Sequence, residues 1–152
     1  MNKIILLFLS VTLAFSDKCI VDRVVDGDTI KLVCDNKKVI CRLAYIDTPE
    51  SRINRKTIRD SIDCNVNIYD MIEEGKKSTL FVKKILKKGK EVNVKFIGIG
   101  RYRRAICLID NVNKLIVERG YGAVYERYAP KYWIEFEKPT KNYIIKCLRR
   151  IR

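Results

Sequence analysis

The chain has 152 residues, of which 47% are hydrophobic, enough for one domain with a real core and too few for two ordinary domains. Its 32 Lys and Arg against 18 Asp and Glu give a formal net charge of +14, which predicts polyanionic partners, either nucleic acid or an anionic membrane surface. It contains no histidine, so a Ser-His-Asp triad, paired imidazole catalysis and a phosphohistidine intermediate are excluded.

Residues 1–16 have the pattern of a secretory signal peptide. A charged start is followed by the apolar run 4–15, with small residues at Ala14 and Ser16. The run is too short to span a membrane easily. Cleavage after Ser16 would remove one Lys, lowering the charge from +14 to +13, and leave 17–152 as a mature domain. We expect that domain to be secreted or periplasmic and not stably inserted in a membrane; an uncleaved anchor is the alternative.

The next part of the chain predicts a three-stranded meander. Segments 19–25, 29–34 and 39–46 are rich in Val, Ile and Leu, and turn-forming residues separate them. The polar, basic stretch 51–67 lacks clear periodicity and is predicted to be a surface loop.

The rest of the chain predicts a helix, two strands, a short helix and a tail. Apolar residues at helical spacing over 69–88 indicate an amphipathic helix, and the alternation over 92–96 indicates a half-buried strand. The remaining expected elements are a strand over 104–109, a short helix over 115–119 and a final basic helix over 141–152. This order predicts an α+β fold built on a five-stranded barrel of the oligonucleotide-binding (OB) type.

Six cysteines lie beyond the proposed cleavage point: Cys19, Cys34, Cys41, Cys64, Cys107 and Cys147. An even number in an exported domain favours disulfides, and six cysteines allow fifteen complete pairings, among which the sequence does not choose. For Cys107, in an apolar strand, a free buried thiol is the alternative. The chain has no closely spaced pair of cysteines and no histidine, so the usual ligands of a zinc site are absent.

Two short acidic stretches stand out in this basic chain. Asp28 follows a predicted turn and Asp47 ends the third predicted strand, so antiparallel folding would bring the two carboxylates together. With the backbone carbonyl of Thr48 they would suit calcium, which prefers oxygen ligands. Either stretch alone is ordinary turn or cap chemistry. Arg42 between them, inside an apolar strand, favours a site because its buried head needs an anionic partner.

Further residues could act on a phosphodiester at this site. Glu50, fixed in direction by Pro49, could orient or deprotonate a water. Arg42 and Arg104 could offer guanidinium groups to phosphate oxygens and to the charge that develops on them.

These residues resemble the staphylococcal nuclease (thermonuclease) family. The similarity is carried by Asp26-Gly27-Asp28-Thr29, by Arg42-Leu43 and by Asp47-Thr48-Pro49-Glu50, with support from Tyr102 to Ile106 and Gly120 to Tyr125. It covers about 21–128, the core of a nuclease domain followed by a basic, aromatic tail over 129–152.

The resemblance implies an OB-fold nuclease that uses Ca²⁺ to hydrolyse DNA and RNA, leaving 3′-phosphate ends. It implies calcium ligation by Asp28, Asp47 and the Thr48 carbonyl, and catalysis by Arg42, Glu50 and Arg104. It also implies that Tyr102, Tyr125 and Tyr128 line the nucleotide site, where aromatic faces accept any base; for Tyr125 and Tyr128, simple packing is an equal alternative. We expect a monomer.

One departure from the family pattern is Arg103, which replaces a glycine and could alter the turn that presents Arg104. Two other classes of function stay open. A nucleic-acid-binding OB module without catalysis need not keep all five matched residues. A cationic membrane-active protein would concentrate its charge on an amphipathic helix, whereas here the basic residues are spread over strands and loops.

Overall fold

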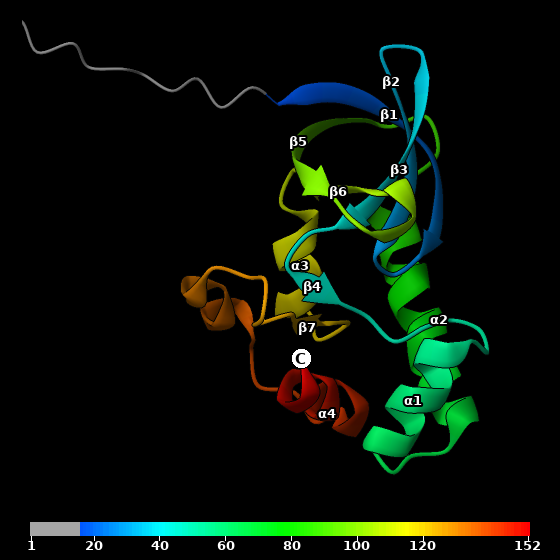
Figure 1. The fold of residues 1–152 in the computed structure, drawn as a ribbon, viewed down its shortest axis with the longest axis vertical. Helices are drawn as coiled ribbons and strands as arrows, with labels where there is room; N and C mark the ends of the chain where they lie inside the picture. The colour runs from blue at the N-terminus through cyan, green and yellow to red at the C-terminus, as the bar shows by residue number, and fades with distance from the viewer. Residues whose placement is uncertain (1–15) are drawn as a thin grey trace, which may run out of the picture.

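A computed structural model describes residues 16–152, so the proposed signal peptide lies outside the described residues apart from Ser16. Five strands form a closed barrel (Figure 1), and the expected OB-type α+β fold is confirmed. Around the barrel they run in the order β1 (Asp17–Asp26), β2 (Thr29–Cys34), β3 (Lys37–Leu43), β6 (Ala105–Ile109) and β5 (Glu91–Ile99). All neighbours are antiparallel except β3 and β6, whose parallel pairing places Arg42 beside Ile106.

The third strand is shorter than the sequence predicts. Tyr45 has a φ of 67°, a left-handed conformation that breaks the strand after β3. The chain then forms β4 (Ile46–Asp47), which pairs with β7 (Ala123–Val124) in a separate two-stranded sheet. Figure 1 shows β4 beneath the barrel, so Asp47, which belongs to β4, is not at the end of a barrel strand.

The loop predicted over 51–67 is wrong, because this stretch contains helix α1 (Arg55–Asp63). Its N-terminus is capped by Asn54, whose side chain accepts a hydrogen bond from the Thr57 amide at 2.9 Å. The buried residues of α1 are the polar Thr57, Asp60 and Ser61. Hydrophobic periodicity could not reveal a helix that buries polar side chains.

The other helices agree with the predicted elements, with shifted ends. Helix α2 (Ile68–Ile85) runs along the barrel, and α3 (Val112–Glu118) follows β6. The tail contains a 3₁₀ helix, η2 (Lys131–Phe136), and ends in α4 (Tyr143–Ile151). None of the helices among the described residues is long and apolar enough to cross a membrane.

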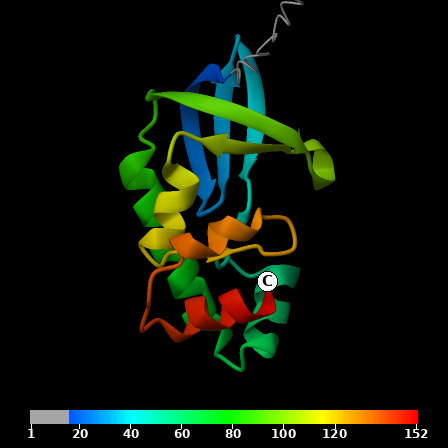
Figure 2. The same ribbon diagram turned by 90° about the vertical axis from the view of Figure 1, so that its left-hand side faces the viewer.

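Residues 16–152 form two hydrophobic cores. The larger core fills the barrel, while the smaller core lies between α2, β7 and α4 and includes Met71, Ala123, Ile145 and Leu148. Figure 2 shows α4 below the barrel, on the far side of the β4–β7 sheet. Asp47, in β4, contacts Arg42 of the barrel and Arg152 at the end of α4, so the acidic residues described below lie between these two parts.

All six cysteines are paired in disulfides. Cys19 bonds to Cys34, Cys41 to Cys107, and Cys64 to Cys147. The first two bonds join neighbouring barrel strands, so Cys107 is bonded rather than free. The third joins the end of α1 to α4, through two cysteines that are 83 residues apart in sequence.

Candidate active site

Arg42 joins the two carboxylates that the sequence singled out. Its Nη1 lies 2.7 Å from Asp28 Oδ1 and its Nη2 lies 2.8 Å from Asp47 Oδ1. Both aspartates are buried, and the Arg42 side chain is 18% exposed. Burial alone would lower the pKa of Arg42, but Asp28 and Asp47 outweigh it and raise the pKa above its ordinary value. The arginine is thus a fixed positive charge between two negative ones.

The second oxygen of Asp28 holds the chain at Thr48. Asp28 Oδ2 accepts a hydrogen bond from the Thr48 amide at 3.1 Å. This bond fixes the start of β2 against the 47–50 segment, although twenty residues separate them. The expected meeting of the two acidic stretches is therefore present, and it depends on backbone as well as side-chain contacts.

Asp26 adds a third carboxyl group near this pair. Its Oδ1 accepts the Asp28 amide at 3.2 Å, which closes the β1–β2 turn. Burial, together with the negative charges of Asp28 and Glu50, raises the pKa of Asp26 from 3.8 to about 7.

Lys56, in the first turn of α1, has four oxygen atoms around its ammonium group. Nζ lies 2.9 Å from the Thr48 carbonyl oxygen, 3.2 Å from Glu50 Oε1 and 3.3 Å from Asp47 Oδ2. Asp60 Oδ2 is a fourth neighbour at 3.4 Å. Burial alone would lower the pKa of Lys56, but Asp47 and Glu50 outweigh it and raise that pKa.

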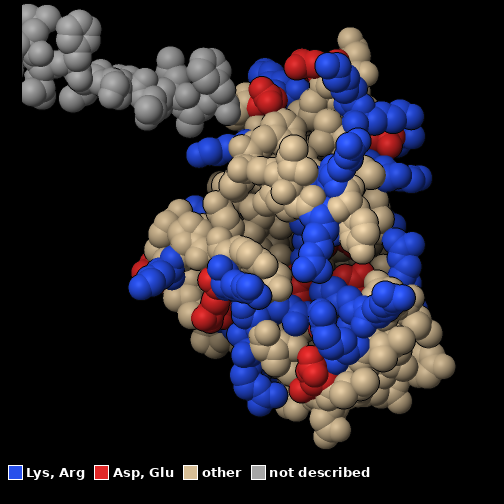
Figure 3. Space-filling model, viewed as in Figure 1, with Lys and Arg blue, Asp and Glu red and all other residues tan. Residues whose placement is uncertain are grey.

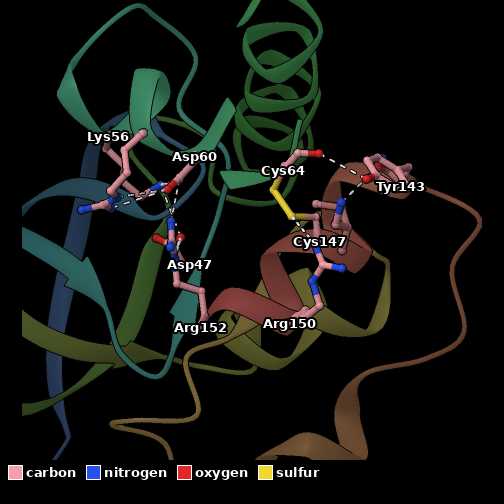
Figure 4. The surroundings of a disulfide bond; sticks show 11 residues. Asp47, Lys56, Asp60, Cys64, Tyr143, Cys147, Arg150 and Arg152 are labelled. Carbon is pink, nitrogen blue, oxygen red and sulfur yellow. Dashed lines mark hydrogen bonds and ion pairs between the residues drawn. A yellow bond between two sulfur atoms is a disulfide. The ribbon is translucent and has the colours of Figure 1, made fainter. Parts of the chain in front are cut away.

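Arg152 reaches the same carboxylates from the end of α4. Its Nε lies 2.7 Å from Asp47 Oδ2, and its Nη2 forms an ion pair with Asp60. Figure 4 shows Arg152 pointing from α4 toward Asp47 and Asp60, with the Cys64–Cys147 disulfide beside them. Burial would raise the pKa of Asp47, but Lys56, Arg42 and Arg152 hold it well below its ordinary value.

Glu50 lies at the edge of this cluster, with its side chain 14% exposed. Its Oε2 accepts a hydrogen bond from Asn54 Nδ2 at 2.8 Å, and its Oε1 faces Lys56. The residue that caps α1 therefore also orients the proposed general base.

Two glycines allow other elements to touch the 47–51 segment closely. A Cβ on Gly75 of α2 would lie 2.7 Å from the Ser51 amide nitrogen and closer still to the Glu50 carbonyl group. A Cβ on Gly122 would lie 2.9 Å from the Asp47 carbonyl oxygen. We did not predict either role from the sequence. One feature of the sequence could have indicated the role of Gly75. A glycine inside a predicted helix lowers stability, so its presence suggests that close packing requires it.

Comparison with known proteins agrees with this architecture. The family model for staphylococcal nuclease homologues matches residues 40–142. The chain belongs to the staphylococcal nuclease family. It is also 32% identical over 111 residues to proteins of Escherichia coli O157:H7 and Escherichia coli that are both named "Uncharacterized endonuclease". The match covers 70% of this chain and 60% of each relative, so the chain spans less than two thirds of their length.

Of the residues with a predicted role in this staphylococcal nuclease family member, Arg104 stands apart from the carboxylates. It follows the short 3₁₀ turn η1 (Arg101–Arg103), and its Nε lies 3.4 Å from the Arg101 carbonyl oxygen. Its guanidinium carbon is 5.9 Å from the centre of the Tyr102 ring. Among residues 16–152 no ion pair links Arg104 to the acidic cluster, although Arg42 and Ile106 are register partners in adjacent strands.

The three tyrosines expected at the nucleotide site lie in two places. Tyr102 is on η1 and is 90% exposed. Tyr125 and Tyr128 pack edge to face, with ring centres 4.9 Å apart. Tyr125 also lies under Arg152, 5.9 Å from its guanidinium carbon. Tyr125 is therefore next to the acidic cluster, whereas Tyr102 accompanies Arg104.

The surface around the cluster is basic. In Figure 3, Lys and Arg side chains gather over the middle of the face, below the barrel, with small acidic areas between them. A positive surface beside buried carboxylates suits a polyanion that must approach a cation-binding centre.

The oxygens of the cluster fit a hard cation in chemical type. Asp28, Asp47 and the Thr48 carbonyl are the donors that calcium prefers, and two of the three already hold the Lys56 ammonium. Within residues 16–152, however, no group of three or more acidic or cysteine side chains is arranged so that it could hold a metal ion as it stands. A metal ion bound here would use oxygens that now contact protein cations.

Proposed function

We propose that the chain is an exported nuclease that hydrolyses phosphodiester bonds in DNA and RNA with calcium as its cofactor, leaving 3′-phosphate ends. The observation that carries the proposal is the buried Asp28–Arg42–Asp47 constellation with Glu50 at its edge. Membership of the staphylococcal nuclease family and the similarity to proteins named as endonucleases support it.

Each group in the constellation has a role that its position favours. A guanidinium has five N–H donors, and Arg42 uses two of its nitrogens on Asp28 and Asp47, so others are left for a phosphate oxygen. Glu50 is partly exposed and oriented by Asn54, which suits a base that holds an attacking water. Calcium on Asp28, Asp47 and the Thr48 carbonyl would add positive charge beside the phosphodiester oxygens.

Arg104 and the tyrosines would bind the rest of the substrate. Arg104 is a second guanidinium for the charge that develops on the phosphate, carried by a turn that would have to bring it toward Arg42. Tyr102, Tyr125 and Tyr128 would offer ring faces to unstacked bases of any kind, which suits a weak sequence preference. The net charge of +14, or +13 without residues 1–16, attracts both polyanions.

Export is part of the proposal. Three disulfides suit an oxidising compartment, either outside the cell or in the periplasm. Residues 1–16 would then act as the signal and 17–152 as the mature nuclease domain.

The decisive experiment incubates the oxidised protein with single- and double-stranded DNA and RNA, first with calcium and then with a chelator. We expect cleavage of all four substrates with calcium and none with the chelator. Glu50→Gln should lower the rate by about 100-fold or more while nucleic-acid affinity stays nearly unchanged, because a general base acts only on turnover. Glu73→Gln, an exposed glutamate on α2, is the matched control and should cleave like wild type.

A second candidate is a nucleic-acid-binding module without catalysis. The observations that favour it are the protein cations on both oxygens of Asp47 and the separation of Arg104 from the cluster. Nucleic-acid binding without cleavage under any of these conditions would establish this candidate and end the nuclease proposal.

A further inference from the structure

The ammonium group of Lys56 is surrounded by four oxygens. Its four oxygen neighbours come from three parts of the chain: the Thr48 carbonyl and Asp47 near β4, Glu50 in the following loop, and Asp60 on α1 itself. All four lie within 3.4 Å of Nζ. These oxygens form a binding site for one positively charged group, and the Lys56 side chain occupies it.

The site of the ammonium overlaps the calcium ligands of the proposed function. The Thr48 carbonyl and Asp47 Oδ2 both face Nζ. Calcium binds oxygens at about 2.3–2.6 Å. An ion on the Thr48 carbonyl and Asp47 Oδ2 would therefore lie close to the ammonium, which is 2.9 Å and 3.3 Å from these same oxygens. Two positive charges a few ångströms apart would also repel strongly in a buried setting. Binding of a divalent ion must therefore displace Nζ.

The Lys56 side chain can move away from the proposed calcium ligands. Its side chain is 22% exposed, and lysine has a long flexible stem with a strongly hydrated head. Asp60 lies four residues further along the same helix and is not among the proposed calcium ligands. The ammonium can withdraw toward Asp60 or solvent while α1 stays in position.

Arg152 is placed differently. Its guanidinium spans Asp47 and Asp60, with no contact to the Thr48 carbonyl among the residues that the structure describes. It neutralises the cluster without filling the position of the ammonium. Lys56 is therefore the cation that contacts both the Thr48 carbonyl and Asp47 among the proposed calcium ligands.

We propose that Lys56 is a built-in competitor for the divalent-cation site, so that calcium binds only by displacing its ammonium group. The proposal rests on the proposed function, because it takes Asp47 and Thr48 from that ligand set. It adds a determinant of metal affinity that lies on α1, outside the motif that carries the family resemblance.

The test measures calcium binding directly, by isothermal titration calorimetry of the whole oxidised protein with calcium chloride. Lys56→Met should bind calcium at least about tenfold more tightly than wild type, because it removes one positive charge from the site. Lys76→Met is the matched control, since Lys76 pairs with Glu73 on the exposed face of α2, and its affinity should equal that of wild type. Unchanged or weaker calcium binding by folded Lys56→Met would overturn the proposal.

A second variant guards against loss of folding. Lys56→Gln removes the charge but keeps a hydrogen-bond donor for the Thr48 carbonyl, and it should also bind calcium more tightly. Circular dichroism and thermal unfolding in chelator identify which variants are folded before titration. Tighter binding confined to Lys56→Met and absent from folded Lys56→Gln would mean that packing rather than charge is responsible, and would contradict the proposal.

Cleavage assays on the same proteins separate this proposal from the proposed function. Tighter calcium binding by both variants, with no cleavage by wild type, would support the competitor and end the nuclease proposal. Calcium-dependent cleavage by wild type, with unchanged affinity in the variants, would support the nuclease and end the competitor.

Discussion

Gly75 allows the backbone at Glu50 to pack directly against a helix, because glycine has no side chain. It lies inside α2, where the backbone of the 50–51 segment passes so closely that a Cβ would be 2.7 Å from the Ser51 nitrogen. Neither the helix nor the loop can yield easily at this point, because α2 packs on the barrel and Glu50 is held by Asn54 and Lys56. The orientation of the proposed base is thus tied to the packing of a helix.

We expect Gly75→Ala to lower the nuclease rate and to destabilise the fold by about 1–3 kcal/mol, because the added methyl group must push the Glu50 backbone away. Cleavage rates and urea unfolding would measure the two effects. Gly98→Ala in β5 is the control, since its Cβ would meet no atom within 4 Å. Wild-type cleavage by Gly75→Ala would show that the contact does not position Glu50.

At this scale the sequence predicted part of the cluster and missed the rest. Asp28, Arg42 and Asp47 were found because a carboxylate pair and an arginine in an apolar strand are unusual within a short stretch. Lys56 and Arg152 were missed because each is one of 32 basic residues. Only the placement of their helices distinguishes them from solvated surface charges.

At the scale of elements, the β5–β6 connection shows the effect of the unusual Arg103. Tyr102 and Arg103 both have positive φ, 58° and 56°, in the turn that closes with the Gly100 amide donating to the Arg104 carbonyl at 2.8 Å. Side chains at such positions are strained, and glycine is favoured at the second of them in turns with two positive φ values. The sequence departure noted above therefore falls on a backbone position suited to glycine.

We expect Arg103→Gly to stabilise the protein by about 0.5–1 kcal/mol, because glycine adopts positive φ without steric cost. Urea unfolding at neutral pH would measure the change. Arg101→Gly is the control, since Arg101 is not among the residues with positive φ, and it should be neutral or destabilising. A loss of stability in Arg103→Gly would mean that the Arg103 side chain makes a contribution larger than the strain.

The elements that the sequence predicted well are those with apolar periodicity. The strands of the barrel and α2 show it, while α1 does not, because it buries Thr57 and Asp60 and exposes Ile58 and Ile62. The early end of β3 was missed for a related reason: Tyr45 is a good strand former, and its left-handed backbone is a consequence of the tertiary fold.

At the scale of the whole molecule, the smaller core contains the Cys64–Cys147 bond. This bond fastens α4 to the end of α1, and Tyr143 adds a hydrogen bond to the Cys64 carbonyl at 3.2 Å. The barrel could be predicted from the order of strands, but the pairing of six cysteines could not, since it depends on which segments meet in space.

We expect the double variant Cys64→Ser/Cys147→Ser to lose about 2–5 kcal/mol of stability and to release α4. Urea unfolding would give the first quantity, and limited proteolysis between η2 and α4 would report the second. Cys19→Ser/Cys34→Ser is the control, because it opens a bond within the barrel and should leave α4 protected. Equal proteolysis of the two variants would show that the smaller core holds α4 without its disulfide.

Arg152 and Asp47 are 105 residues apart in sequence, yet they form one of the shortest ion pairs in the acidic cluster. During synthesis Asp47 is therefore made well before the last turn of α4. The charge balance of the cluster is consequently incomplete until α4 has docked, and the Cys64–Cys147 bond fastens α4 in that position. We therefore expect oxidation of this cysteine pair and assembly of the acidic cluster to be linked.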